Sequence, residues 1–319
     1  MKVRVLDAAA IRRACSMPEA IDAVEAGFVA LSSGRAHVPL RATLPLRGPG
    51  SILLVMPAAL DGAARASVKV VSVVPGNEAR GLPLVQAAVL VVDADSGAPR
   101  ALLDGTTFTA LRTGAAGGVA ARRLARADAR VVALYGTGAQ ARTQLEALLA
   151  VRRIREVRVV SRSREHALAF ATDFARPGVR LLVAGREAAR GADVVICATT
   201  SVEPVFDADS LADGAHVTGV GSYRPDMREI PPEAFHGALV VVDQREAALA
   251  EAGELVAAVR GGILRAVDLV EIGEERARRT SDAQRTVFKS VGNAVQDLVV
   301  ADRVVARAET EGLGTVVDL

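Results

Sequence analysis

Aromatic residues and cysteines are scarce in this sequence of 319 residues, and tryptophan is absent. Hydrophobic residues make up 50% of the chain but aromatic residues only 3%, so its core must be built from alanine, valine and leucine. The two cysteines, Cys15 and Cys197, are too few for a disulfide framework, and we expect two reduced thiols. The four histidines lack the spacing of metal ligands, so no metal site is expected.

An excess of charge of either sign is also missing. The chain has 39 basic and 37 acidic residues, which gives a formal net charge of +2. Proteins that bind nucleic acids or membrane surfaces normally carry a basic face or tail, so we expect neither partner. No apolar run approaches the length of a membrane span, and the first residues lack the apolar segment of a secretory signal. We therefore expect a soluble, cytoplasmic protein.

Lysine is the rarest charged residue, because only three of the 39 basic residues are lysines: Lys2, Lys69 and Lys289. Lys69 lies within ASVKVVSVV, a run otherwise suited to a strand that is buried on both faces. Burying an ammonium group without a partner is costly, and a lysine can give up a proton whereas an arginine cannot. We therefore predict a catalytic role for Lys69; the alternative is a residue at a strand edge whose ammonium group reaches water.

Residues 1–128 mix predicted strands and helices. Ser16 and Glu19 form the capping-box pattern of a helix that ends before Gly34. Strand-like runs follow at SILLVMP, ASVKVVSVV, LVQAAVLVVD and RALLDG, and the turn DADSGAP predicts a hairpin between the last two.

A further helix is predicted to open near Thr109, which would place Arg112 in its first turn. The helix dipole disfavours a cation at that end, so an anionic ligand beside Arg112 would explain it. Arg41, in VPLRATLPL, is less distinctive by itself.

The pattern changes near residue 130. Short apolar runs recur at RVVALYG, EVRVVS, VRLLVA, DVVICAT, AHVTGVG and ALVVVD, separated by helix-like segments or turns. Because these runs lack polar alternation, both faces of their sheet must be covered, as in a parallel sheet between helices. The pattern predicts an α/β fold with a doubly wound parallel sheet of the Rossmann type. The last long stretch, SVGNAVQDLVVADRVVARAETEG, has the apolar spacing of a helix.

The segment LYGTGAQAR carries two glycines between a predicted strand and a predicted helix. In such a unit the first glycine permits a tight turn, the second lets the backbone approach a pyrophosphate, and Ala141 allows close packing of the helix on the strand. The phosphates would meet N–H groups at the start of the helix. The alternative is a tight turn without a ligand. We predict dinucleotide binding, with contacts from Gly136, Thr137, Gly138, Ala139 and Gln140.

The end of the next strand distinguishes the two nicotinamide dinucleotides. A carboxylate there would accept hydrogen bonds from the ribose of NAD, but the sequence reads VVSRSRE, with Ser161 in the place of the acid. A hydroxyl group and the guanidinium groups of Arg162 and Arg164 suit a 2′-phosphate. The expected cofactor is NADPH, with NADH or NAD as alternatives.

Together these segments resemble the ornithine cyclodeaminase/mu-crystallin family. The matching stretches include VPLRATLPL, VKVVSV, LLDGTTFTALRTGAAGGVAARRLAR, LYGTGAQAR, VICATTS, VTGVGSYRPDMREI and TVFKSVGNAVQDLVVA, in the family's order. The resemblance implies a nicotinamide-binding Rossmann domain at residues 119–289. It also implies a second, α+β domain for substrate binding and dimerisation, formed by residues 1–118 and 290–319, and hence a homodimer.

The resemblance also implies roles for individual residues. The basic residues that hold the substrate carboxylate in the family match Arg41, Lys69 and Arg112, and we take Lys69 and Arg112 as the candidate catalytic residues. Further contacts to the cofactor are expected from Thr113, Thr199, Thr200, Gly221, Ser222 and Lys289.

Members of the family differ in reaction: some cyclise ornithine to proline, some are alanine dehydrogenases, and mu-crystallin reduces cyclic ketimines with NADPH. Where the cyclodeaminases carry an essential aspartate, this sequence has Tyr223, and Asp226 stands three residues further on. We therefore expect NAD(P)H-dependent reduction of small cyclic ketimine carboxylates, such as pyrroline-2-carboxylate or piperideine-2-carboxylate. The alternatives are ornithine cyclodeamination with recycled NAD, an alanine dehydrogenase-like reaction, and a dinucleotide-bound protein with a structural role.

Overall fold

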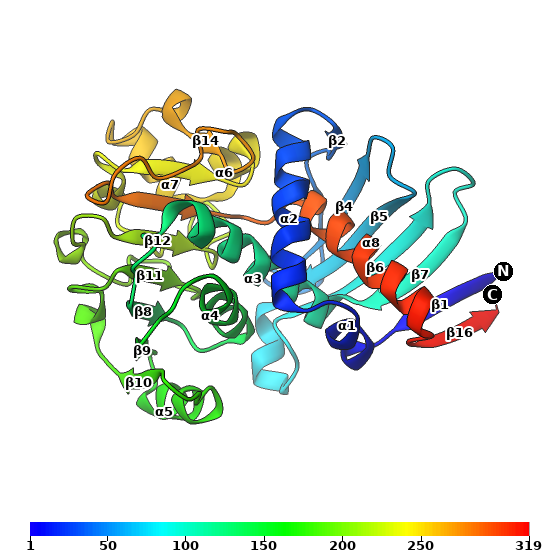
Figure 1. The fold of residues 1–319 in the computed structure, drawn as a ribbon, viewed down its shortest axis with the longest axis horizontal. Coiled ribbons are helices and arrows are strands. Elements are labelled where there is room, and N and C mark those ends of the chain that lie inside the picture. The colour runs from blue at the N-terminus through cyan, green and yellow to red at the C-terminus, as the bar shows by residue number, and fades with distance from the viewer. Residues whose placement is uncertain (319) are drawn as a thin grey trace. The chain divides into compact units, whose positions relative to one another are not determined.

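The computed structural model describes residues 1–318, with the side chain of Glu78 left aside, and the chain divides into two compact units (Figure 1). The first unit contains Met1–Arg112 and the chain from Asn293 onward, and the second unit is Thr113–Gly292. The first division falls inside helix α3 (Gly105–Leu124), after Arg112 rather than after residue 118. A helix that continues through a boundary leaves no turn signal in the sequence to mark it.

The first unit is an α+β unit built on one sheet. All neighbouring strands run antiparallel except β1 and β7, which are parallel. The strands lie in the order β16 (Thr315–Asp318), β1 (Lys2–Leu6), β7 (Pro99–Asp104), β6 (Val85–Asp93), β5 (Arg65–Val73), β4 (Ile52–Leu60) and β2 (Ala36–His37), and β3 (Ala42–Pro45) also pairs with β4.

Helices α1 (Ala8–Ala14), α2 (Met17–Ser32) and α8 (Ala294–Glu311) lie in this unit, which also contains the start of α3. Helix α8 lies against β4, β5 and β6 and also contacts α2 (Figure 1). The predicted capping box of α2 is confirmed, because the Ser16 hydroxyl accepts from the Glu19 N–H and the Glu19 carboxylate accepts from the Ser16 N–H. The predicted hairpin between β6 and β7 is confirmed as well.

The predicted start of the next helix is wrong. Helix α3 begins at Gly105, because the Asp104 carboxylate accepts hydrogen bonds from the N–H groups of Thr106 and Thr107. Arg112 therefore lies well inside the helix and not in its first turn, and the helix dipole does not explain its presence there.

One face of the first unit's sheet carries an apolar row that crosses five strands. The pairing aligns Pro57 with Val68, Val68 with Leu90, Leu90 with Leu102, and Leu102 with Val5. Leu102 is 41% exposed and Val5 is 36% exposed. A contiguous apolar sheet surface of this kind is typical of a protein–protein contact.

The second unit is a doubly wound α/β unit whose eight strands are all parallel. Its strands lie in the order β10 (Arg180–Val183), β9 (Glu156–Val160), β8 (Val131–Tyr135), β11 (Val194–Cys197), β12 (His216–Gly219), β15 (Thr286–Lys289), β13 (Leu239–Val242) and β14 (Val270–Glu271). Its further helices are α4 (Ala139–Val151), α5 (Arg164–Asp173), α6 (Arg245–Glu251) and α7 (Gly253–Arg260).

Both faces of this parallel sheet are buried, as the unbroken apolar runs predicted. Val132 and Leu134 of β8 pack in one core cluster with residues of α4 and α5. Ala133 and Tyr135, which point to the other face, pack in a second cluster with residues of α6 and α7. Within the described residues, no helix is both long and apolar enough to cross a bilayer.

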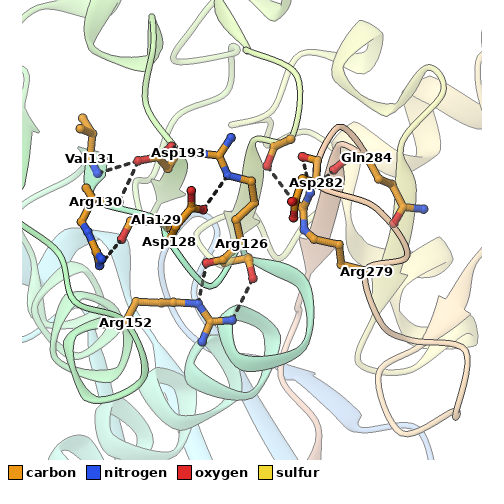
Figure 2. Close-up of polar contacts among 12 residues, drawn as sticks. Arg126, Asp128, Ala129, Arg130, Val131, Arg152, Asp193, Arg279, Asp282 and Gln284 are labelled. Carbon is orange, nitrogen blue, oxygen red and sulfur yellow. Dashed lines mark hydrogen bonds and ion pairs between the residues drawn. The ribbon is translucent and has the colours of Figure 1, made fainter.

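Arginines organise the edge of this sheet at which the parallel strands begin (Figure 2). Arg152 donates to the carbonyl groups of Arg122, Ala125 and Arg126, so its guanidinium group satisfies the last turn of α3. The Asp193 carboxylate binds the Arg126 guanidinium at 2.7 Å and also accepts from the backbone N–H groups at the start of β8. Charged side chains here act as partners for backbone groups that would otherwise be unsatisfied.

His216 is fully buried at the start of β12, close to these arginines. Its Nδ1 lies 2.9 Å from the Thr286 hydroxyl, which donates to the carbonyl of Leu124, so Nδ1 carries the proton. Its Nε2 then accepts from the Thr218 hydroxyl. Burial and the charges of Arg279 and Arg152 lower the pKa of His216 to about 3.

We expect the free energy of unfolding to fall as the pH drops below about 6.5. The neutral His216 of the folded protein resists protonation down to about pH 3, whereas the unfolded chain binds a proton near the ordinary pKa of 6.5. The His216 contribution is fully present above pH 6.5 and is lost toward pH 3, by up to about 5 kcal/mol. Urea unfolding of the wild type and His216→Gln between pH 7 and 4.5 measures it; equal slopes in both proteins would contradict this assignment.

Candidate active site

Lys69 lies on the buried face of β5 and is 1% exposed. The strand alternates, so that Ser67, Lys69 and Val71 are buried while Val70 on the opposite face is exposed. The ammonium group is not at a strand edge, because β4 and β6 flank β5 on its two sides. A buried ammonium group requires an anionic partner, and α8 supplies it.

Asp297, in the first turn of α8, is that partner. Its carboxylate lies 2.9 Å and 3.1 Å from Lys69 Nζ, and its exposed fraction is 0%. The positive end of the α8 dipole attracts the negative charge of a carboxylate at this position. Sequence analysis missed Asp297, although an acid within the apolar pattern of NAVQDLVVA is the kind of signal that identified Lys69.

Arg112 reaches the same carboxylate from α3. Its Nε lies 3.0 Å from Asp297 Oδ1, and its Nη1 donates to Gln296 Oε1 at 2.5 Å. Arg41, between β2 and β3, is half-buried, and its charge acts on Lys69. The three basic residues that the sequence nominated therefore share one region of the first unit, and one aspartate links two of them.

Burial lowers the pKa of Lys69 to about 7, with a smaller contribution from the positive charge of Arg112, while Asp297 opposes the shift. A lysine with this pKa can donate or accept a proton near neutral pH. The cations of Lys69 and Arg112 outnumber the single carboxylate of Asp297 that they share. The cluster can therefore accept a further anion, such as a substrate carboxylate.

The glycine turn of the second unit has the features that a dinucleotide requires. Gly136 has φ of +110°, and a Cβ there would lie 2.3 Å from the carbonyl oxygen of Ala198, so only glycine fits. A Cβ on Gly138 would meet no atom within 4 Å, which leaves room for a phosphate beside the backbone. Gly138 is the N-cap residue of α4 and makes no side-chain cap hydrogen bond, so the N–H groups of the first turn can bind a phosphate.

Helix α3 packs closely on α4 beneath this turn. A Cβ on Gly117 would lie 1.8 Å from the side-chain oxygen of Gln144, and one on Gly114 would lie 2.6 Å from the carbonyl oxygen of Thr143. Gln144 in turn donates to the carbonyl of Thr113 at 2.7 Å. The glycines of RTGAAGG thus position Thr113 and the start of α4 within one packed layer.

The remaining cofactor candidates follow the strand ends at the same edge of the parallel sheet, where ligands of doubly wound folds bind. After β9, Ser161 is half-buried and Arg162 and Arg164 are exposed, while Ser163 caps α5. The others lie after or at the ends of three further strands: Thr199 and Thr200 after β11, Gly221 and Ser222 after β12, and Lys289 at the end of β15.

Lys289 is fully buried, and its ammonium group is occupied within the second unit. Its Nζ donates to the carbonyl and the hydroxyl of Ser222, at 2.8 and 2.6 Å, and lies 3.2 Å from Glu254 Oε1. The hydroxyl of Ser222 donates to the other oxygen of Glu254. The side chains of Lys289 and Ser222 therefore bind one another and support the loop after β12. Direct contact of this loop with a cofactor is accordingly proposed for its backbone.

Tyr223 follows Ser222 in the same loop. Its ring is half-buried, and the Arg224 guanidinium lies over it, 5.7 Å from the ring centre. Burial raises the pKa of Tyr223 above that of an ordinary phenol, so its hydroxyl group is neutral at pH 7. Asp226 pairs with Arg224 at 3.0 Å and is exposed. Tyr223 therefore brings no carboxylate to this loop, and the carboxylate of Asp226 is exposed and paired.

Known proteins resemble this chain over nearly its whole length. The model of the ornithine cyclodeaminase/mu-crystallin family matches residues 1–312. A Delta(1)-pyrroline-2-carboxylate reductase of Bacillus cereus is 38% identical over 320 residues, which cover 97% of this chain and 98% of the relative. The chain belongs to the ornithine cyclodeaminase/mu-crystallin family.

Two solved structures share the fold closely. The Delta(1)-pyrroline-2-carboxylate reductase of Thermococcus litoralis, in complex with NADH and L-proline, is 36% identical with a TM-score of 0.94, and the match covers 98% of this chain and 99% of that one. An archaeal alanine dehydrogenase dimer with bound NAD is 35% identical with a TM-score of 0.93, and the match covers both chains completely.

We expect Asp297→Asn to destabilise the first unit by about 3–5 kcal/mol, because it leaves two buried cations without their carboxylate. Asp302→Asn is the matched control on the same helix, since Asp302 pairs with Arg65 in a partly exposed ion pair, 2.8 Å apart. Its loss should cost less than about 1 kcal/mol. Denaturant unfolding measures both; similar costs for the two variants would show that Asp297 does not hold the cluster together.

Proposed function

We propose that this member of the family reduces small cyclic ketimine carboxylates, of the pyrroline-2-carboxylate or piperideine-2-carboxylate type, with a nicotinamide cofactor. The observation that carries the proposal is the buried cluster of Lys69, Asp297 and Arg112, which combines an excess of positive charge with a lysine whose pKa is about 7. The names of the relatives in Bacillus cereus and Thermococcus litoralis support the same substrate class.

The first unit would bind the carboxylate of the substrate. Arg112 offers a guanidinium group whose Nε and Nη1 already face Asp297 and Gln296, so the group is held in one orientation. Arg41 adds a second cation. A carboxylate bound by these groups fixes the imine carbon, to which it is directly bonded, and the imine nitrogen, which is the next atom in the same small ring.

Lys69 would supply the proton. When bound, the reduced nicotinamide supplies the hydride for the imine carbon. The reaction adds one hydride to carbon and one proton to nitrogen, and Lys69 at its pKa of about 7 is a suitable proton donor to that nitrogen. Asp297 keeps the resulting neutral lysine in place and favours its reprotonation.

A spectrophotometric screen tests the proposal. Consumption of NADPH or NADH is followed with pyrroline-2-carboxylate, piperideine-2-carboxylate, and pyruvate with ammonia or methylamine. We expect turnover with the cyclic imines. We expect no formation of proline from ornithine with catalytic NAD, since Tyr223 cannot act as a carboxylate. Turnover restricted to pyruvate with ammonia would identify an alanine dehydrogenase, and proline formation from ornithine would identify a cyclodeaminase.

We expect kcat/KM for imine reduction to be constant below pH 7 and to fall about tenfold per pH unit above it. The protonated form of Lys69 is the required donor, and it is lost above a pKa of about 7. Lys69→Arg keeps the charge but cannot release a proton, so turnover should fall by at least about a hundredfold and the decline above pH 7 should disappear. A decline that persists in Lys69→Arg would mean that another group donates the proton.

We further propose that NADPH binds more tightly than NADH. The end of β9 offers Ser161, Arg162 and Arg164 and no carboxylate. One or two guanidinium contacts to the 2′-phosphate would favour NADPH by about 1.5–3 kcal/mol, or about tenfold or more in affinity. Fluorescence titrations of the wild type and of Arg162→Ala/Arg164→Ala measure the preference. Equal affinities in the wild type, or a preference that survives the double substitution, would contradict it.

We propose that two copies of the chain associate through the apolar row of the first unit. The row spans β4, β5, β6, β7 and β1, and the archaeal alanine dehydrogenase of the same fold is described as a dimer. Light scattering should give a dimer for the wild type. Leu102→Asp should give a monomer, whereas the control Leu168→Asp, at an exposed position of α5, should not. A monomeric wild type at micromolar concentration would overturn the proposal.

A further inference from the structure

Glu229 is a fully buried acid in the segment between β12 and β13, outside the helices and strands. Both of its carboxylate oxygens accept hydrogen bonds from backbone N–H groups. Oε1 accepts from Thr199 at 2.5 Å, and Oε2 accepts from Gly221 at 2.6 Å and from Ser222 at 3.1 Å. An acid that accepts three backbone hydrogen bonds in the interior is a structural link between the segments that donate them.

The two linked segments are the loops that leave β11 and β12 at the edge of the sheet. These strands are parallel neighbours, so their loops start side by side. The loops are packed directly on one another: a Cβ on Gly221 would lie 2.1 Å from the carbonyl oxygen of Thr199 and 2.5 Å from Glu229 Oε1. The two loops can approach one another this closely only because residue 221 is glycine. The Glu229 carboxylate lies beside Gly221, where a Cβ would otherwise point.

A second buried link joins the same loop to β15. Lys289, the last residue of that strand, donates to the carbonyl and hydroxyl of Ser222, and Glu254 accepts from that hydroxyl. Three consecutive strand ends, β11, β12 and β15, are thereby connected by side chains that are 0% exposed. This degree of internal support is unusual for loops, which ordinarily vary in conformation.

The strand order indicates which part of a dinucleotide these loops would meet. The glycine turn after β8 would bind the pyrophosphate, and the end of β9, on one side of β8, would bind the adenosine ribose. The other half of the dinucleotide therefore extends to the opposite side, toward β11 and β12. That half carries the nicotinamide.

We propose that Glu229 is a positioning residue that holds the loops after β11 and β12 in the arrangement that receives the nicotinamide half of the cofactor. It acts through the backbone at Thr199, Gly221 and Ser222 and does not touch the cofactor. The inference depends on the proposed function only in that a nicotinamide dinucleotide binds the second unit.

Glu229→Gln removes this support at constant size. The amide has one oxygen, so its NH₂ group must face at least one backbone N–H, and a buried donor loses its acceptor. The loops after β11 and β12 would then shift relative to one another, and the contacts that they offer the nicotinamide half would weaken. The glycine turn after β8 and the end of β9 contribute no hydrogen bond to Glu229, so the site for the adenosine half should keep its shape.

The test compares two ligands by calorimetry on the full chain: NADPH, and 2′-phospho-ADP-ribose, which lacks the nicotinamide ring. In Glu229→Gln we expect the Kd of NADPH to rise about tenfold or more, and that of the truncated ligand to change less than about twofold. The control is Glu233→Gln, at an exposed position of the following turn, which should change neither Kd. Equal weakening of both ligands, or no weakening of NADPH, would overturn the inference.

Hydrogen exchange of the wild type gives an independent result if the variant does not fold. Without cofactor, the amides of Thr199, Gly221 and Ser222 should exchange slowly, because Glu229 already holds them, and added NADPH should slow them little. Fast exchange that only NADPH suppresses would overturn the inference. Neither measurement uses an imine, so a failure of the proposed substrate class is distinguishable from a failure of the role of Glu229.

Discussion

The carboxylate of Asp297 between two buried cations is the interaction on which the candidate chemistry of the first unit depends. Removing three charged groups from water costs several kcal/mol each, and hydrogen bonds and ion pairs at about 3 Å offset that cost. The three residues come from a strand, from a helix and from the far end of the chain. Helix α8 therefore has two roles. It covers the sheet, and its Asp297 raises the pKa of Lys69 against the opposing effect of burial.

The second unit uses the same device for a different purpose. Glu229 follows both loops in the sequence, and both of its carboxylate oxygens accept hydrogen bonds from the N–H groups of these loops. In the first unit, Asp297 affects the pKa of a side chain, Lys69. In the second unit, Glu229 fixes the backbone of two loops. Both acids lie within a few ångströms of groups assigned to function, and neither needs to contact a ligand itself.

Local sequence patterns predicted the features that arise locally. The glycine turn, the capping box of α2 and the parallel sheet with two covered faces follow from short-range rules, and Lys69 was found because its strand is otherwise apolar. Asp297 and Glu229 were missed because their partners lie far away in the sequence, where no spacing rule applies. Arg112 was selected for an incorrect reason: Asp104 starts α3 earlier than expected, and the cation is explained by Asp297.

The scarcity of lysine has a practical consequence for chemical labelling. Lys69 is 1% exposed and Lys289 is 0% exposed, so Lys2, at the exposed start of β1, is the one lysine side chain of the described residues open to solvent. A reagent that acylates lysine side chains would therefore modify the folded protein at Lys2. A fluorophore or a surface attached by this route would sit on β1, the strand that pairs with β16. Such a conjugate needs no engineered cysteine and leaves the residues of both proposed sites unmodified.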